Sequence, residues 1–364
     1  MLKKYDDKIG AREFFALMIF CIGTKYTDST PILLISEGLN ASWIIPIISG
    51  LIILLPVLCL LSLLRLYKNK NLLDIIYHLM GKFFGFIIIF LLFSISFEYL
   101  AVSTRDYADI IGTMFYLRTP MTFILFILIA GSTYIASKGF STIASLCWLA
   151  FPVLQIVVVA LVIMIWSKLD LNYLFPLGGP GVKTILKQGV YFTTIIGEVI
   201  LLAIFFPKVR SHKQYKLGSF LGLLFPILNF SLFLIIYTSA FGYPTLASLN
   251  YPFHQLTRLV QIGRFARNVE ALFLGFWVIA SSVRLAIYLY VAAVLLGYLL
   301  RLKNTKGLVF YISIMVFLIS LIPSNYTSYI LTIRKIEVHT FWIYFIFVPI
   351  LLWSIAKLKG EYRS

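Results

Sequence analysis

The chain has 364 residues, of which 61% are hydrophobic and only 12% are charged. A soluble domain needs more polar surface than this composition supplies, so we interpret the chain as a polytopic membrane protein. Its formal net charge is +17. The basic residues lie in short clusters between apolar spans and form no continuous basic face, which favours the lipid bilayer as the partner and argues against nucleic acid.

Ten apolar stretches follow one another along the chain, and each is interpreted as a transmembrane helix. They lie at about 13 to 36, 43 to 65, 83 to 103, 120 to 137, 142 to 166, 185 to 206, 216 to 241, 268 to 299, 308 to 323 and 340 to 357. An even number of crossings puts both termini on one side. Segments on that side hold 19 of the 31 Lys and Arg residues, so the positive-inside rule predicts cytoplasmic termini.

The ten spans divide into two halves of five, at about 13 to 166 and about 185 to 357. An odd number of spans in each half makes their topologies opposite, which is the inverted repeat of many secondary transporters. We therefore predict an all-α membrane protein with ten transmembrane helices in a 5+5 inverted repeat of the LeuT or APC type. Residues 1–364 are expected to form a single permease-like domain.

The stretch from 182 to 207 is apolar enough to cross a bilayer but carries polar residues near its middle, namely Thr193, Thr194, Gly197 and Glu198. An ionised side chain at mid-membrane costs about 2.5 to 3.5 kcal/mol, so Glu198 should face a cavity, a partner charge or a ligand. Gly197 beside it is expected to loosen the helix and expose backbone groups to a ligand.

The first span contains a matching interruption, because Gly23 is followed by Thr24, Lys25 and Tyr26 and by further polar residues up to Pro31. Broken helices at matching positions of the two halves point to a site near the middle of the membrane, where helix ends and freed backbone groups meet a substrate. A structural alternative remains, in which both glycines are only small residues at helix contacts.

Glu98 is an acidic residue in the outer half of the third span. It lines an entry path in one interpretation and forms an interfacial ion pair with Arg105 in the other. Both alternatives are open at this point.

Arg284 lies near the middle of the eighth span, close to Ser281 and Ser282. A central arginine needs an acidic partner, and Glu198 is the natural candidate, although a purely structural pair satisfies the physics equally well. Lys25 is the other cation within a span. Because a basic side chain stands where sodium binds in some sodium-independent transporters of this architecture, we hypothesise that Lys25 or Arg284 does so here.

Catalytic and metal-binding patterns are not visible in the sequence. The histidines and the three cysteines lack metal-ligand spacing, and no hydrolase, zinc or kinase motif is found. We therefore expect neither a cofactor nor enzyme activity, and a membrane-embedded enzyme is the least favoured class of function.

The outer segment at about 251 to 267 combines apolar residues with three arginines, which predicts an amphipathic helix in the outer membrane interface. This segment and the start of the next span resemble the signature of the B subunits of bacterial spore germinant receptors, the GerAB-type spore germination permeases. The matching residues are Tyr251, Pro252, Leu256, Arg258, Ile262, Gly263, Phe265, Arg267, Glu270, Phe273 and Trp277. Further resemblances lie at Ile22, Gly23, Thr24, Trp43, Arg105, Asp106, Arg118, Thr119, Pro120, Gly197, Glu198, Phe206 and Pro207.

The resemblance implies an amino-acid/polyamine/organocation transporter fold in the inner membrane of an endospore. It further implies a germinant receptor A subunit and a C lipoprotein subunit as partners, and a small nutrient such as an amino acid, a sugar or a nucleoside as germinant. Lys25 and Asp28 depart from the apolar stretch that is usual in the family, which leaves the identity of the ligand open.

The candidate substrate-binding residues are thus the polar residues of the two breaks, with Glu98 and the Ser281, Ser282 and Arg284 group. An amino-acid ligand is expected to place its carboxylate against the amides of Gly23 and Thr24 and its ammonium toward Glu198. Binding then signals to partner subunits or gates an ion path. The alternative function is a free-standing secondary amino-acid transporter driven by an ion gradient.

Overall fold

The computed structural model describes residues 8–68, 70–246, 248–260, 269–302, 304–323 and 326–362, and its regular structure there is helical. The α-helices are α1 (Ala11–Ile22), α2 (Thr30–Gly38), α3 (Ile44–Leu66), α4 (Leu72–Met114), α5 (Met121–Ser137), α6 (Phe140–Ile165), α7 (Val182–Tyr191), α8 (Thr193–Ile196), α9 (Val199–Leu202), α10 (His212–Phe241), α11 (Tyr243–Leu246), α12 (Pro252–Arg258), α13 (Val269–Leu299), α14 (Lys306–Leu321) and α15 (Tyr326–Leu358). Short 3-10 turns are η1 (Gly23–Thr27), η2 (Leu39–Ala41), η3 (Trp166–Lys168), η4 (Leu171–Leu174) and η5 (Ala203–Lys208). The all-α prediction is confirmed.

Within the described residues, 7 helical stretches are long and apolar enough to cross a membrane. They are Ile44–Leu66, Leu72–Met114, Phe140–Lys168, Val182–Lys208, His212–Phe241, Glu270–Leu299 and Leu331–Leu358. Two shorter apolar helices, Met121–Ser137 and Gly307–Leu321, accompany them. Such a set of apolar helices is that of a multi-pass membrane protein. The number of ten crossings and their division into two halves stay predictions.

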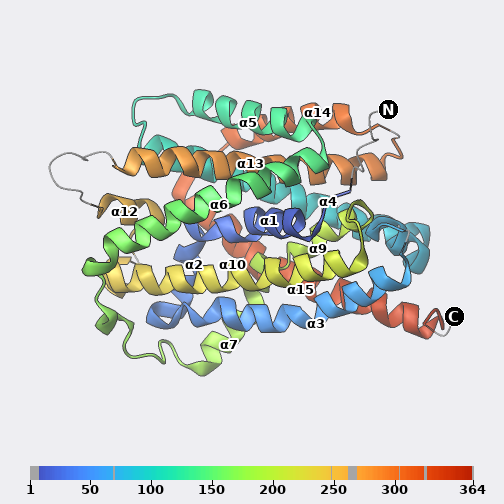
Figure 1. Ribbon diagram of the computed structural model, residues 1–364, viewed down its shortest axis with the longest axis horizontal. Helices are drawn as coiled ribbons and strands as arrows, with labels where there is room; N and C mark the ends of the chain where they lie inside the picture. The colour runs from blue at the N-terminus through green and yellow to red at the C-terminus, as the bar shows by residue number, and fades with distance from the viewer. Residues whose placement is uncertain are drawn as a thin grey trace.

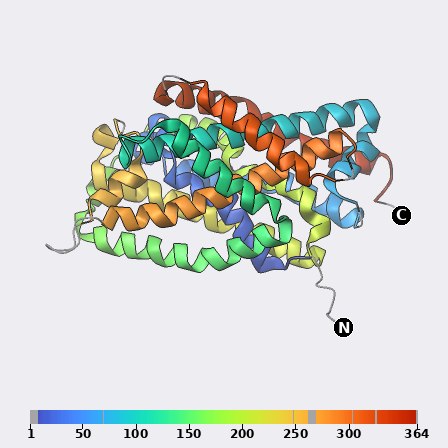
Figure 2. The same cartoon turned by 90° about the horizontal axis from the view of Figure 1, so that it is seen from above.

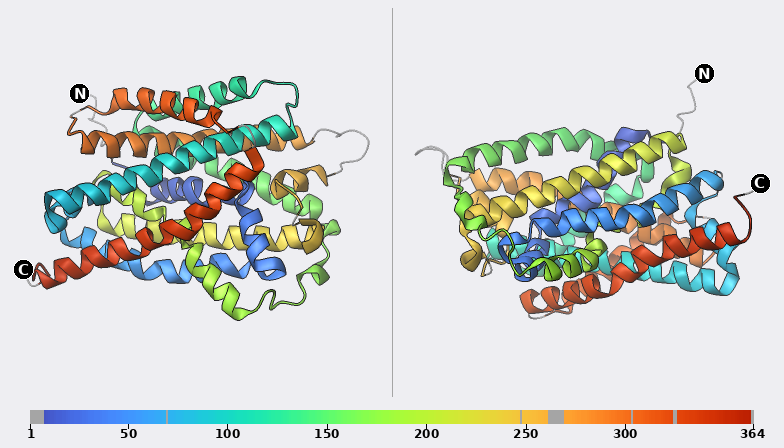
Figure 3. Two further views of the ribbon diagram at one scale, coloured as in Figure 1. Left: turned by 180° about the vertical axis from the view of Figure 1, so that it is seen from behind. Right: turned by 90° about the horizontal axis from the view of Figure 1, so that it is seen from below.

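The long helices lie roughly along one common axis, and α1 lies in the middle of the molecule (Figure 1). The near face in Figure 1 is crossed by α6 and α10, and the view from above places α6 along that side (Figure 2). Seen from behind, α4 and α15 cross the opposite face (Figure 3). Because α1 packs directly against α6 and α10, the break that follows α1 lies between these two faces.

Large apolar side chains cover the outside of the helices. Phe83, Leu149 and Ile163 have 72%, 73% and 69% of their surface exposed. In a bilayer such side chains contact lipid at no cost, so the hydrophobic effect does not drive them inward. Polar groups have the opposite preference, because each unsatisfied one in hydrocarbon costs several kcal/mol. The interior around the breaks is accordingly where the buried charges lie.

The two described ends of the chain lie at the same end of the helix bundle (Figure 1). The amide of Ile9 donates to the carbonyl of Lys208, the last residue of η5, at 2.9 Å. The ammonium of Lys359 donates to the carbonyl of Leu79 at 3.0 Å, near the start of α4. These contacts attach the two described ends of the chain to the end of η5 and to α4.

Two helices extend beyond the spans expected from hydropathy. Helix α4 continues past position 103 to Met114 and keeps Arg105, Asp106 and Asp109 buried. Helix α15 begins at Tyr326, well before position 340. Asp106 and Arg334 in these extensions pair with each other inside the protein, and a hydropathy profile does not register such pairing.

Helix α12 occupies part of the outer segment for which an interfacial helix is expected. Phe253, His254 and Leu256 are buried, and α12 packs against η1, α10 and α13. Arg258 at its end is partly exposed and forms an ion pair with Glu270, with Nε 3.0 Å from Oε2. Residues 261–268 lie outside the described residues, so an interfacial helix over 251–267 stays a prediction.

His254 gives the folded protein a pH-dependent stability. Its ring packs at right angles to that of Trp277, with centroids 4.7 Å apart. Burial, and after it the positive charge of Arg258, lowers the pKa of His254 to about 3. In the unfolded chain the pKa of histidine is about 6.5. Below about pH 6.5 the unfolded chain therefore binds a proton that the folded chain does not, and stability falls until about pH 3.

We expect His254→Phe to remove this loss. At about pH 5 the wild-type protein should have lost about 2 kcal/mol from this group relative to about pH 7.5. Unfolding curves in detergent at both pH values measure the difference, with His339→Phe as the control. Equal acid losses in the wild-type protein and in His254→Phe would contradict the assignment.

Candidate functional site

The break in the first apolar segment is centred on Asp28. Its backbone is extended, with φ −100° and ψ −158°, and separates η1 from α2. The Asp28 Oδ1 atom accepts the amide of Thr30 at 2.7 Å, and Pro31 occupies the first turn of α2, where no amide donor is needed. Gly23 keeps a helical conformation, and its amide donates to the carbonyl of Ile19. This amide is therefore already bonded, contrary to the expectation that it is free to bind a carboxylate.

The second break separates α8 from α9 at Gly197 and Glu198. Both residues remain helical, with ψ of −12° and −18°, and the amide of Ile200 donates to the carbonyl of Gly197 at 2.9 Å. The chain is tightened toward a 3-10 helix here and is not unwound. A Cβ at Gly197 would come within 2.5 Å of the Phe345 ring in α15. Gly197 is thus required for close helix packing, as the structural alternative proposes.

An ion pair between Lys25 and Glu198 joins the two breaks. The Lys25 Nζ atom lies 2.5 Å from Glu198 Oε1, and the two side chains are 4% and 1% exposed. Lys25 also donates to the carbonyl of Ile195 at 2.9 Å and lies 5.2 Å from the centre of the Tyr99 ring. The hydroxyl of Tyr288 donates to the other oxygen of Glu198. Glu198, which is predicted to lie inside the protein, is therefore paired with the Lys25 ammonium and the Tyr288 hydroxyl.

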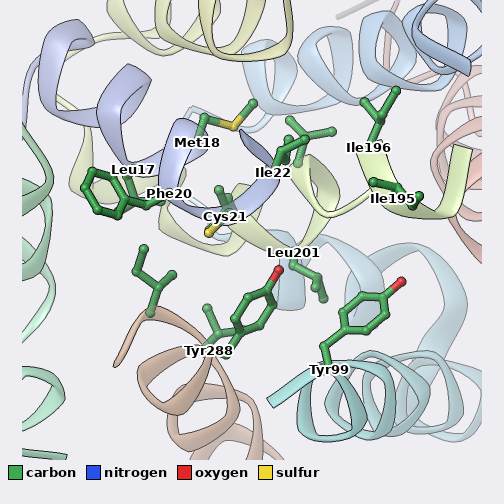
Figure 4. Packing of buried hydrophobic residues seen from close by; sticks show 14 of the residues in the cluster. Leu17, Met18, Phe20, Cys21, Ile22, Tyr99, Ile195, Ile196, Leu201 and Tyr288 are labelled. Atoms are coloured by element: carbon green, nitrogen blue, oxygen red, sulfur yellow. The ribbon is translucent and has the colours of Figure 1, made fainter. Parts of the chain in front are cut away.

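Apolar side chains enclose this pair. Figure 4 shows Tyr288 and Tyr99 among Cys21, Ile195 and Leu201. Water is largely absent from such surroundings, so the attraction between the two charges is strong and loss of either one is costly.

A second group of buried charges lies beside the break at Asp28. Its Oδ2 atom is 3.3 Å from Arg284 Nη1 and 3.4 Å from Arg334 Nη2. The same Arg334 nitrogen is 2.7 Å from Asp106 Oδ2, which also accepts the hydroxyl of Ser29 at 2.8 Å. We call Asp28, Asp106, Arg284 and Arg334 the four-charge cluster. It ties the first break to α4, α13 and α15.

The expected pairing of Arg284 with Glu198 is wrong. Arg284 pairs with Asp28, and its Nη1 atom also donates to the hydroxyls of Tyr107 at 2.8 Å and Thr24 at 3.3 Å. Lys25 lies in the first break and Arg284 contacts it, but Lys25 pairs with Glu198 and Arg284 pairs with Asp28.

Several other predicted residues bind backbone carbonyls. The hydroxyl of Thr193 donates to the preceding turn at 2.6 Å, that of Thr194 to the carbonyl of Val338 in α15 at 3.1 Å, and that of Ser281 within α13 at 2.8 Å. Ser282 is half-buried. Of these residues, Thr194 alone links two elements of the site.

Tyr26 and Glu98 lie away from the ion pair. The Tyr26 ring stacks on Phe233 in α10, with centroids 4.2 Å apart. Glu98 is half-buried on α4. The structure records no ion pair between Glu98 and Arg105, whose guanidinium donates to the carbonyl of Ser320 at 2.7 Å. An entry path along Glu98 stays a prediction.

A small cavity of about 20 Å³ lies beside the Lys25 ammonium. Tyr99, Thr194, Arg334 and Glu337 are among the residues that line it. This volume holds about one water molecule. Glu337 is buried, and its Oε1 atom has no hydrogen-bond partner among the described residues. The site therefore combines charges of both signs with almost no free space.

Sequence reasoning missed Arg334 and Glu337, which it assigned to an outer segment. Their spacing of three residues was the available signal, because residues three apart share one face of a helix. Within the described residues, no group of three or more His, Cys, Asp or Glu side chains is arranged to hold a metal ion.

Comparisons with known proteins add the following. A family model described as "Spore germination protein" matches residues 8–329. Among relatives from Bacillus subtilis (strain 168), the putative spore germination protein YfkT is 27% identical over 304 residues, covering 80% of each chain. Spore germination protein KB is 23% identical over 371 aligned residues, covering 98% of this chain and 96% of the relative. Spore germination protein A2 is 26% identical and covers 87% and 86%.

A solved structure of similar fold is that of MHP1, a nucleobase-cation-symport-1 family transporter, in a closed conformation with bromovinylhydantoin bound. The TM-score is 0.64 at 16% identity, over 93% of this chain and 79% of that one. At this identity the likeness shows the fold alone, which is that of a transporter. The match of the family model over residues 8–329, most of the chain, shows that the chain belongs to the spore germination protein family.

Proposed function

We propose that the chain is the nutrient-sensing membrane subunit of a spore germination receptor, which binds an amino acid between its two breaks. The observation that carries this proposal is the small cavity lined by Lys25, Arg284 and Arg334 and by Glu337, whose Oε1 atom has no hydrogen-bond partner among the described residues. An amino acid presents one carboxylate and one ammonium. A site with a cation and an acid on separate walls matches that pair of charges.

In this mechanism the germinant carboxylate binds the Lys25 ammonium, and the germinant ammonium binds Glu337 and Glu198. Lys25 must then exchange its present partner Glu198 for the ligand. Because the cavity has room for about one water molecule, binding requires the walls to separate, and α15 carries two of the lining charges. Ligand shifts the equilibrium between closed and open forms only by its differential affinity for them.

The movement of α15 relative to the first break is the proposed signal. It passes to a receptor A subunit and a C lipoprotein subunit, or it opens a path for ions. We further propose ten crossings in a 5+5 inverted repeat within a single domain, with cytoplasmic termini, in the inner membrane of the spore. The attachment of both chain ends to one end of the bundle and the excess of Lys and Arg in the segments assigned to that side support this topology.

A germination screen tests the proposal. Spores that lack the chain are exposed to single nutrients, and the nutrient whose response is lost identifies the germinant. Glu337→Gln removes the proposed ammonium partner and breaks no ion pair, so we expect normal protein level and at least about a tenfold rise in the germinant concentration needed. Glu270→Gln, on the partly exposed ion pair with Arg258, is the control. An unchanged response of Glu337→Gln at normal protein level counts against this site.

The transporter fold makes a free-standing secondary amino-acid transporter the second candidate. The two functions differ in output while sharing fold and site. If the purified chain, reconstituted alone in liposomes, accumulates labelled amino acid when an ion gradient is applied, the result favours transport. A response that requires the A and C subunits favours a receptor.

A further inference from the structure

A second cavity, of about 60 Å³, lies on the other face of the first break. It is lined by residues of α1, η1, α6, α10, α12 and α13, whereas the charged cavity is lined by residues of η1, α2, α4, α8, α13 and α15. Thr24 and Thr27 face the second cavity, and Lys25 lies on the wall of the charged one. The two cavities share no lining residue. The broken segment is therefore the partition between them.

Among the described residues, no charged side chain lines the second cavity. Its walls are mostly aromatic and aliphatic, and Trp277 donates through Nε1 to the Thr27 hydroxyl at 2.9 Å. The Thr27 hydroxyl in turn donates to the carbonyl of Thr24 at 2.6 Å. The Trp277 donor and the Thr27 hydroxyl in the wall are thus already engaged with protein partners.

Two carboxamides are the exception. Gln155 of α6 and Asn229 of α10 line the cavity and are half-buried. No hydrogen bond joins either amide to another residue in the part of the chain that the structure describes. An amide left unsatisfied in apolar surroundings costs about 1 to 3 kcal/mol. Two such groups on facing helices, at one cavity in an otherwise apolar region, indicate an occupant that forms hydrogen bonds.

The volume and charge of the cavity limit this occupant. A cavity of about 60 Å³ exceeds the roughly 10 to 15 Å³ that one water molecule needs. A charged ligand would lose its hydration without gaining a counter-charge, which is a cost that an uncharged ligand avoids. The volume and the lining residues suit a small apolar body with one carbonyl, amide or hydroxyl group.

We propose that this cavity is a second binding site, separate from the charged site, for a small uncharged molecule with an apolar body and a hydrogen-bonding group. Gln155 and Asn229 bind the polar group, and the aromatic wall around Trp277 contacts the body. The occupant touches the same broken segment that carries Lys25, and Arg284 connects the two sides through Thr24.

Equilibrium dialysis of the purified full chain in lipid nanodiscs tests this site, with labelled isobutyramide as the probe and isobutyrate as its charged counterpart of the same shape. We expect saturable binding of isobutyramide and binding of isobutyrate that is at least about tenfold weaker. Asn229→Leu should weaken isobutyramide binding about fivefold, as loss of one hydrogen bond does.

A matched pair of variants on α6 locates the probe. Val158 lines the cavity, so Val158→Phe should fill it and abolish binding. Val159 is its exposed neighbour, and Val159→Phe should bind isobutyramide as the wild-type protein does. Glu270→Gln, on the partly exposed ion pair with Arg258, should also leave isobutyramide binding unchanged.

Three outcomes overturn the proposal. The first is absence of saturable binding in nanodiscs, which means that an acyl chain or no ligand fills the cavity. The second is equal binding by Val158→Phe and Val159→Phe, which places the probe elsewhere. The third is equal binding of isobutyrate and isobutyramide, which removes the argument from charge.

Discussion

Replacing Glu198 with glutamine is expected to destabilise the protein by about 3 to 5 kcal/mol, because it leaves the Lys25 ammonium buried without its counter-charge. Lys25 would keep the carbonyl of Ile195 and the face of Tyr99, but neither carries a full negative charge. Unfolding of the purified protein in detergent, followed by helix content against denaturant concentration, measures the change.

The double variant Lys25→Met with Glu198→Gln distinguishes charge from shape. Removing both charges is expected to recover most of the stability, because the cost of a broken buried pair lies mainly in the partner left behind. Glu270→Gln at the partly exposed pair should cost less than about 1 kcal/mol. If the double variant loses as much as the sum of the two single ones, the two charges are not coupled.

Asp28→Asn is expected to have a comparable effect, with a loss of about 3 to 5 kcal/mol. Asp28 is the ion-pair partner of Arg284 and also lies near Arg334, so its neutralisation leaves two guanidinium groups with only Asp106 as an acid of the four-charge cluster. The asparagine carbonyl can still accept the amide of Thr30, and the start of α2 should therefore be preserved. The loss of stability in Asp28→Asn then measures the effect of removing the negative charge.

Asp106→Asn is the matched comparison for Asp28→Asn. Arg334 would keep Asp28, and Arg284 would keep its present acid, so we expect the smaller loss of the two. Unfolding under the same detergent conditions gives both values. A larger loss for Asp106→Asn than for Asp28→Asn would show that the cluster does not depend on the acid in the break.

Glu198 shows how far the sequence determines the site. The cost of a carboxylate in hydrocarbon predicts that Glu198 faces the interior, and the structure buries it against a cation. The identity of that cation does not follow from the sequence, since Lys25 and Arg284 are both within spans. Which of them reaches Glu198 depends on how the broken segment and α13 are rotated relative to α8 and α9, and a linear pattern does not contain that rotation.

Arg334 and Asp106 illustrate a second limit. Hydropathy counts each charge as a reason to end a span, and so the predicted helices stop short of both residues. In the structure these charges neutralise each other at 2.7 Å, which allows α4 and α15 to continue through the interior. The all-α architecture is predictable from composition, because lipid requires each helix to satisfy its own backbone. Pairings between distant helices arise only from tertiary packing.

The four-charge cluster has a consequence for biogenesis. Its members come from the first break, α4, α13 and α15, and α15 follows the other three elements along the chain. During synthesis Asp106 is made long before Arg334, and an unpaired charge inside a membrane span is costly, with about 2.5 to 3.5 kcal/mol at the centre of the bilayer. We therefore expect the early helices to stay near the translocon, or near water, until α15 has been inserted. Insertion and tertiary assembly of this cluster are then coupled steps that are complete only after α15 has been made.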